Sequence, residues 1–244
     1  MNELLADYAV RIAPGLAVIG ALLLFRVRPI VRVGLYIIIF ILFRDLMTPL
    51  GLWSLGDEGG LWLRIYPSGV FMVAFGVSAA AALLAIHYLD RENRCYVSFF
   101  RGKHHVLGLA IGLLTAILVV SPFFFIYPNV PIGERGGGVA ASLLFPLAIF
   151  SLFGNFFEEG IFRGYVLGYL SERHSLTVAG IASGFVFAAC HSFLAITVTD
   201  VGLPLLLFTV WEGILAGLVG ARYGVIPATL THGGAIFLLA SGLW

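Results

Sequence analysis

Residues 139–163 read VAASLLFPLAIFSLFGNFFEEGIFR, an apolar run that closes on two adjacent glutamates and an arginine. The run is long enough to cross a hydrocarbon core of about 30 Å as one helix. Insertion scales assign an ionisable side chain at the bilayer centre a cost of about 2.5–3.5 kcal/mol, so such a group needs a partner, a cavity or a function. This stretch therefore predicts a membrane-spanning helix that carries a polar site.

The composition of the whole chain also indicates a membrane protein. Of the 244 residues, 60% are hydrophobic and 11% are charged, whereas soluble domains carry about 25% charged residues. The 14% of aromatic residues and the net charge of +1 exclude a disordered chain. A nucleic-acid partner is excluded because no basic patch exists to neutralise phosphates. Two cysteines without a zinc-type spacing build no disulfide framework. We expect an all-α, polytopic helix bundle in a lipid bilayer.

Eight apolar runs have the length of membrane-spanning helices. They cover residues 8–25, 33–53, 65–88, 106–127, 139–160, 176–196, 201–221 and 225–244. The second run is the weakest, because Arg44 and Asp45 interrupt it, so we expect about eight spans. The acidic start of the chain, with Glu3 and Asp7, argues against a cleavable signal peptide.

Basic residues lie in alternate connections between these runs. They are Arg26, Arg28, Arg32, Arg91, Arg94, Arg101, Lys103, Arg173 and Arg222. Cytoplasmic loops carry an excess of Lys and Arg, so these connections should face the cytoplasm and both termini should lie on the other side. We expect a multi-pass protein of the cell (inner) membrane.

Two acids and a base form the densest polar group of the chain. On a helix, Glu159 and Arg163 are separated by four residues, with the acid N-terminal to the base, which is the favourable order for an ion pair. Glu158 is turned about 100° from Glu159 and stays available for other contacts. Asn155 lies on nearly the same face as Glu158. The alternative interpretation is that these residues only cap a helix where it meets water.

Two histidines in later spans are expected at a similar depth. Glu158 and His191 each lie about 16 residues from the turn at 172–175, which places both about 24 Å from it along helices. His232 lies only five residues after Pro227. It reaches the same level if the turn projects about 15 Å into the cytoplasm. The site would then lie not far below the cytoplasmic face.

A carboxylate and two imidazoles in a water-accessible membrane cavity suit general acid–base chemistry. The carboxylate can deprotonate a water, and an imidazole can polarise a carbonyl or stabilise its oxyanion. The same three residues also suit a zinc ion with an open coordination position. The residue types alone leave both alternatives open.

These residues, in this order, resemble the CAAX-protease and bacteriocin-processing (Abi-type) family of intramembrane proteases. The resemblance covers about 139–244. Its Glu-Glu-x-x-x-Arg motif matches Glu158, Glu159 and Arg163, and its Phe-x-x-x-His motif matches Phe187 and His191. Its third motif matches at His232, but Ile236 occupies the position of the family's asparagine. We therefore expect N-terminal transmembrane helices over 1–138 and a catalytic helical core over 139–244.

The resemblance implies a glutamic-type endopeptidase without metal or cofactor, acting on a membrane-associated protein or peptide near the cytoplasmic interface. It implies that Glu158 activates the attacking water, that His191 assists the proton transfer and that His232 belongs to the same site. Glu159 and Arg163 would orient the base. Because isoleucine offers no hydrogen-bond donor, we hypothesise that Asn155 supplies the amide that stabilises the oxyanion.

Two other function classes fit parts of the pattern. Intramembrane acids and histidines also form proton relays, so a proton-coupled carrier is one alternative. The departure at Ile236 makes a noncatalytic membrane scaffold or immunity protein the other. Glu212, in the seventh apolar run, is an acid that no motif explains. It is either a hydrogen-bonded structural group or a residue that supports the site.

Overall fold

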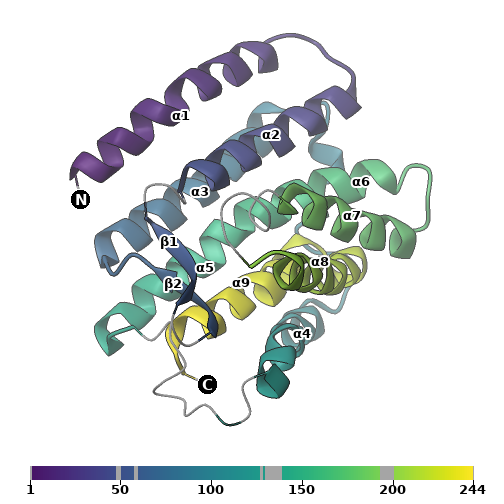
Figure 1. Ribbon diagram of the computed structural model, residues 1–244. Helices are drawn as coiled ribbons and strands as arrows, with labels where there is room; N and C mark the ends of the chain where they lie inside the picture. The colour runs from purple at the N-terminus through teal and green to yellow at the C-terminus, as the bar shows by residue number, and fades with distance from the viewer. Residues whose placement is uncertain are drawn as a thin grey trace.

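The computed structural model describes residues 2–47, 51–57, 60–126, 129, 139–192 and 201–243, which form an all-α bundle (Figure 1). The expected fold class is confirmed. The helices are α1 (Asn2–Leu23), α2 (Pro29–Met47), α3 (Gly69–Leu89), α4 (His105–Ile126), α5 (Leu144–Glu159), α6 (Leu167–Leu170), α7 (Leu176–Cys190), α8 (Leu203–Tyr223) and α9 (Val225–Ser241). Short 3-10 turns lie at Arg94–Tyr96 and Ala141–Leu143.

Four helical segments in the described part of the chain are long and apolar enough to cross a membrane. They are Gly69–Leu89, His105–Phe125, Ala141–Leu170 and Leu203–Tyr223. Shorter apolar helices include Pro29–Leu42, Leu176–Cys190 and Val225–Ser241. The chain is thus a multi-pass integral membrane protein, while the expected number of about eight spans stays a prediction.

The second expected span, 33–53, is wrong at its C-terminal end, where the chain forms a β-hairpin instead of a helix. Helix α2 ends at Met47, and strands β1 (Trp53–Asp57) and β2 (Gly60–Ile65) pair antiparallel, with Trp53 opposite Ile65. The reason is a change of hydrophobic period: the side chains of Trp53, Leu63 and Ile65 are buried while those of Ser54 and Arg64 are exposed. Such alternation fits a strand and cannot form one helical face.

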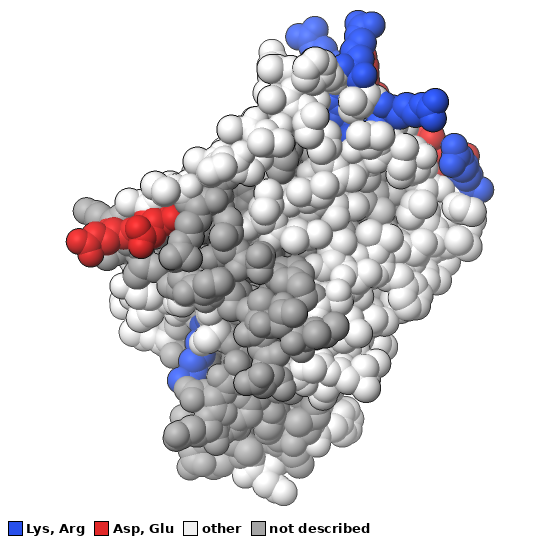
Figure 2. Space-filling view, turned by 45° about the horizontal axis from the view of Figure 1, so that its top comes forward, with Lys and Arg blue, Asp and Glu red and all other residues white. Residues whose placement is uncertain are grey.

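The hairpin and the basic loops lie at opposite ends of the bundle. The hairpin joins the end of α2 to the start of α3, whereas Arg26 and Arg28 precede α2, and Arg91 and Arg94 follow α3. Figure 2 shows most of the visible Lys and Arg side chains gathered at one end of the molecule, with a smaller basic patch away from it. By the positive-inside rule, we expect this end to face the cytoplasm.

Helices α7 and α8 pack closely because glycines face each other. A Cβ atom added to Gly184 would lie 2.6 Å from the carbonyl oxygen of Gly213, and one added to Gly180 would lie 2.6 Å from that of Gly217. Small residues of this kind let helices approach in a membrane, where packing replaces the hydrophobic driving force. The contact also fixes the Gly213 carbonyl, which the site uses.

Candidate active site

The Glu-Glu pair lies where α5 changes its helical geometry. Helix α5 ends at Glu159, and the chain continues without a break as a π-helical segment, Gly160–Val166. Helix α6 follows directly, so the three segments form one continuous helical rod. Every residue of the π-helical segment is buried. π-Helical turns occur frequently at functional sites. Here the turn contains Arg163, so the altered winding sets where its guanidinium points.

The ion pair expected from the four-residue spacing forms in the protein interior. Arg163 Nη1 donates to Glu159 Oε1 at 2.8 Å, and both side chains are fully buried. Arg163 Nη2 donates to the carbonyl oxygen of Gly213 at 2.8 Å, which ties α5 to α8. Two donors in this rigid fork hold the guanidinium, and therefore Glu159, in one position.

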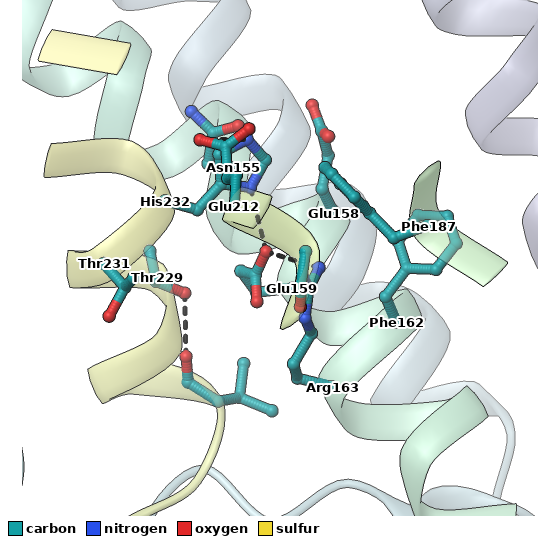
Figure 3. Close-up of polar contacts among 12 residues, drawn as sticks. Asn155, Glu158, Glu159, Phe162, Arg163, Phe187, Glu212, Thr229, Thr231 and His232 are labelled. Atoms are coloured by element: carbon teal, nitrogen blue, oxygen red, sulfur yellow. Dashed lines mark hydrogen bonds and ion pairs between the residues drawn. The ribbon is translucent and has the colours of Figure 1, made fainter. Parts of the chain in front are cut away.

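His232 is the second partner of Glu159. Its Nδ1 atom lies 2.8 Å from Glu159 Oε1, the same oxygen that accepts from Arg163 (Figure 3). Because an ionised carboxylate only accepts, the proton of this imidazole lies on Nδ1. The Nε2 atom then faces Glu212, whose Oε1 lies 3.8 Å away. The Nδ1–H of His232 thus donates to Glu159 and not to the neighbouring Glu158.

Glu158 and His191 form the other half of the polar group. His191 follows the last residue of α7, and its Nε2 lies 4.0 Å from Glu158 Oε2. The Nδ1 atom of His191 lies 2.8 Å from the carbonyl oxygen of Phe187, so Nδ1 carries the proton and Nε2 keeps a lone pair towards Glu158. Both side chains are buried. One oxygen of a water can lie within hydrogen-bond distance of both atoms.

Phe187 explains why the motif combines a phenylalanine with a histidine four residues later. Its ring centroid lies 4.2 Å from that of His191 and 5.2 Å from that of His232. The guanidinium of Arg163 lies 4.5 Å from the same centroid. A single buried ring therefore separates the two imidazoles and restricts the rotation of each.

Asn155 and Ile236 lie in the wall of one cavity with these groups. The cavity has a volume of about 100 Å³, which is enough to hold several water molecules. Its polar wall comprises Asn155, Glu158, His191, Thr209, Glu212 and His232. The amide Nδ2 of Asn155 donates to the carbonyl oxygen of Ser151 at 2.6 Å, and its second N–H stays available.

The rest of the cavity wall is apolar and reaches away from the basic end. It includes Trp53, Leu63 and Ile65 of the hairpin and Phe208 and Leu205 of α8. Residues of the first half of the chain therefore contribute to the cavity, including Phe75 and Phe123. An apolar cavity next to a group of polar side chains suits a substrate with a polar reacting bond and apolar flanking groups.

Glu212 is the site residue whose position the sequence left open. It lies in the middle of α8, is 3% exposed and lines the cavity beside His232. The signal that pointed to it is the cost of an acid inside an apolar span, because such a group is retained for a reason. No group of three or more His, Cys, Asp or Glu side chains among the described residues is arranged to hold a metal ion.

A comparison with protein families finds a match in the second half of the chain. Residues 140–238 match the family model described as type II CAAX prenyl endopeptidase Rce1-like. This segment contains the Glu158–Arg163 motif, His191, Glu212 and His232. No curated protein and no solved structure matches the chain.

Proposed function

We infer that this chain, which belongs through residues 140–238 to the Rce1-like family of type II CAAX prenyl endopeptidases, cleaves its substrate with a water activated by Glu158. The family implies an intramembrane endopeptidase whose substrate is a membrane-associated protein. The observation that carries the catalytic assignment is the pairing of Glu158 Oε2 with His191 Nε2 across 4.0 Å in the wall of the cavity.

The first step is proton removal from a water held between these two atoms. A carboxylate and an imidazole lone pair both accept, so the water donates one hydrogen to each and directs its oxygen towards the substrate. Glu158 takes the proton as the oxygen attacks the scissile carbonyl. His191 keeps the water in place, because its own Nδ1–H is held by the Phe187 carbonyl.

The developing oxyanion requires a donor from the same cavity. Asn155 lies one helical turn before Glu158 and has an N–H that is not used by Ser151. It therefore takes the role of the family's asparagine, whose position holds Ile236. Glu159 and Arg163 do not touch the substrate in this scheme. They keep His232 in its orientation through the shared Oε1 atom.

The depth of the site supports cleavage near the cytoplasmic interface. His232 is seven residues after Val225, where α9 begins, which is about 10 Å along a helix. The start of α9 is joined to the basic loop, because the amide of Val225 donates to Ser98 and that of Ile226 to Phe99. The apolar cavity then extends from this level into the membrane and accommodates the apolar groups of the substrate.

A comparison of terminal peptides tests this function. Membrane proteins from cells that express the wild type are compared with those from cells that express Glu158→Gln at equal abundance. A defined new terminus with the wild type alone is the expected result. Glu92→Gln, a change of an exposed carboxylate in a loop, is the matched control and should cleave normally.

The same comparison decides between the proposed function and its alternatives. If the termini do not differ and both the wild type and Glu158→Gln rescue the deletion phenotype, the catalytic proposal is wrong. A scaffold, for which the isoleucine at position 236 is the argument, would explain that result. Loss of rescue without any difference in termini would favour a proton-coupled carrier.

A further inference from the structure

Glu212 is a buried acid that the scheme above leaves without a role. Its Oε1 atom accepts no hydrogen bond from the described residues, and Nε2 of His232 lies 3.8 Å from it. That separation is too long for a hydrogen bond. Both residues line the cavity, and Figure 3 shows Glu212 beside His232 and apart from Glu158.

Charge balance determines how many protons this pair holds. Arg163 and Glu159 neutralise each other, and the Nδ1 proton of His232 is directed at Glu159. Without a further proton, a carboxylate of Glu212 would face the lone pair of Nε2, and the buried group would carry a net negative charge. With two further protons the group would be net positive. One proton, on either Glu212 or Nε2, leaves the four side chains Arg163, Glu159, His232 and Glu212 neutral, a state that burial favours. The carboxylate of Glu158 in the same cavity wall favours retention of this proton.

Peptide hydrolysis also needs a proton at the leaving nitrogen. An amine leaves poorly as an anion, so the nitrogen must be protonated as the C–N bond breaks. Glu158 and His191 hold the water, and both are acceptors at this stage. Either the protonated base returns its proton to the amine, as one histidine does in serine proteases, or a second group in the same cavity that already holds a proton donates it.

We propose that Glu212 and His232 together hold one proton and deliver it to the leaving nitrogen, which makes Glu212 a second catalytic acid. This inference rests on the proposed function. The water oxygen bonds to the carbonyl carbon and gives its proton to Glu158. The C–N bond breaks, its electron pair remains on nitrogen, and nitrogen takes the proton of the Glu212–His232 pair. Water in the cavity then carries the proton from Glu158 back to the pair.

Cleavage of a peptide with an amide or with an ester at the scissile bond distinguishes a catalytic role of Glu212 from a structural one. The full-length protein in proteoliposomes is assayed with an internally quenched farnesylated CAAX peptide and with its analogue that carries an ester at the cleaved bond. An alkoxide leaves without prior protonation far more easily than an amine anion. Glu212→Gln should therefore lower kcat/KM for the amide by about 100-fold or more and that for the ester by no more than about threefold.

Three further variants make the result decisive. Glu158→Gln should lose both activities, because both reactions need the activated water. Thr209→Val removes a polar group from the same cavity wall, one turn before Glu212 on α8, and should keep the amide-to-ester ratio of the wild type. Glu212→Asp keeps the carboxyl group but moves it away from the cavity by one methylene. It should lower the amide-to-ester ratio of kcat/KM by about tenfold.

The outcomes separate this inference from the proposed function. Equal losses for amide and ester in Glu212→Gln, or no loss, would overturn the role of Glu212 and leave the role of Glu158 intact. If Glu212→Gln does not fold, the ratio in Glu212→Asp decides, and an unchanged ratio overturns the proposal. If the wild type cleaves neither probe, the proposed function fails first, and this inference fails with it.

Discussion

His232 follows Glu159 by 73 residues, yet its Nδ1 atom lies 2.8 Å from Oε1 of Glu159. The same oxygen accepts from Arg163, so one buried carboxylate joins α5, the π-helical turn and α9. The Arg163 donor to Gly213 adds α8 to this network. The network thus orients an imidazole of the cavity and also connects three helices of the bundle.

Removal of the buried cation should destabilise the protein. Arg163→Ala leaves Glu159 charged in a fully buried position, a change that typically costs about 3–5 kcal/mol of folding free energy. Unfolding in mixed micelles measures this cost. Arg26→Ala is the control, because Arg26 and Glu92 form an exposed pair at 3.9 Å and exposed pairs contribute little. Equal stability of the two variants would show that the buried network does not support the fold.

Replacement of His191 should impair catalysis and leave substrate binding intact. His191→Ala removes the atom that holds the water opposite Glu158, and we expect kcat to fall by about 10²–10⁴-fold with KM nearly unchanged. Steady-state kinetics on the farnesylated peptide separates the two constants. His174→Gln, in the exposed turn before α7, should behave as the wild type. A rise in KM alone would place His191 in substrate binding.

A double substitution tests the oxyanion donor. Asn155→Ala should lower kcat by about 10²–10³-fold, the usual loss for one oxyanion donor. Ile236→Asn introduces an amide four residues after His232, on the same face of α9. In the Asn155→Ala background it should restore part of the lost rate. Full activity of Asn155→Ala beside an inactive His232→Ala would rule out Asn155 as the donor.

Chemical labelling tests the orientation of the bundle. Cys95 is exposed in the basic loop after α3, so a membrane-impermeant maleimide should reach it only after permeabilisation. Ser54→Cys places an exposed thiol on the hairpin, and this thiol should react in intact cells. The experiment uses a Cys190→Ala background to remove the second natural thiol. The reverse labelling pattern would place the basic end outside and would move the cleavage site to the outer face.

Local patterns predicted a large part of the site. The pair of Glu159 and Arg163 follows from a four-residue spacing, because helix geometry brings such positions together whatever surrounds them. The common depth of Glu158 and His191 follows from counting residues along helices on either side of one turn. The structure places both in one cavity wall. The catalytic roles of these residues remain predictions for the experiments above.

Other features had no local signal of sufficient strength. The two ends of the hairpin, at Trp53 and Ile65, were included in expected helices. A short apolar run has the same hydropathy in a strand and in a helix, so hydropathy did not distinguish them. The π-helical turn at Gly160–Val166 differs from an α-helix by one hydrogen-bond register, and composition does not report that difference.

The sequence by itself determined that this protein is a helical membrane bundle with a buried acid–base pair, because hydropathy and spacing act over one or two helical turns. Only the tertiary structure decided that His232 binds Glu159, that His191 faces Glu158 and that Glu212 joins the cavity. Each of these contacts spans at least 20 residues of sequence, and their formation depends on how closely α5, α7, α8 and α9 approach. That approach is set by small residues such as Gly184 and Gly213 and by the register of the π-helical turn.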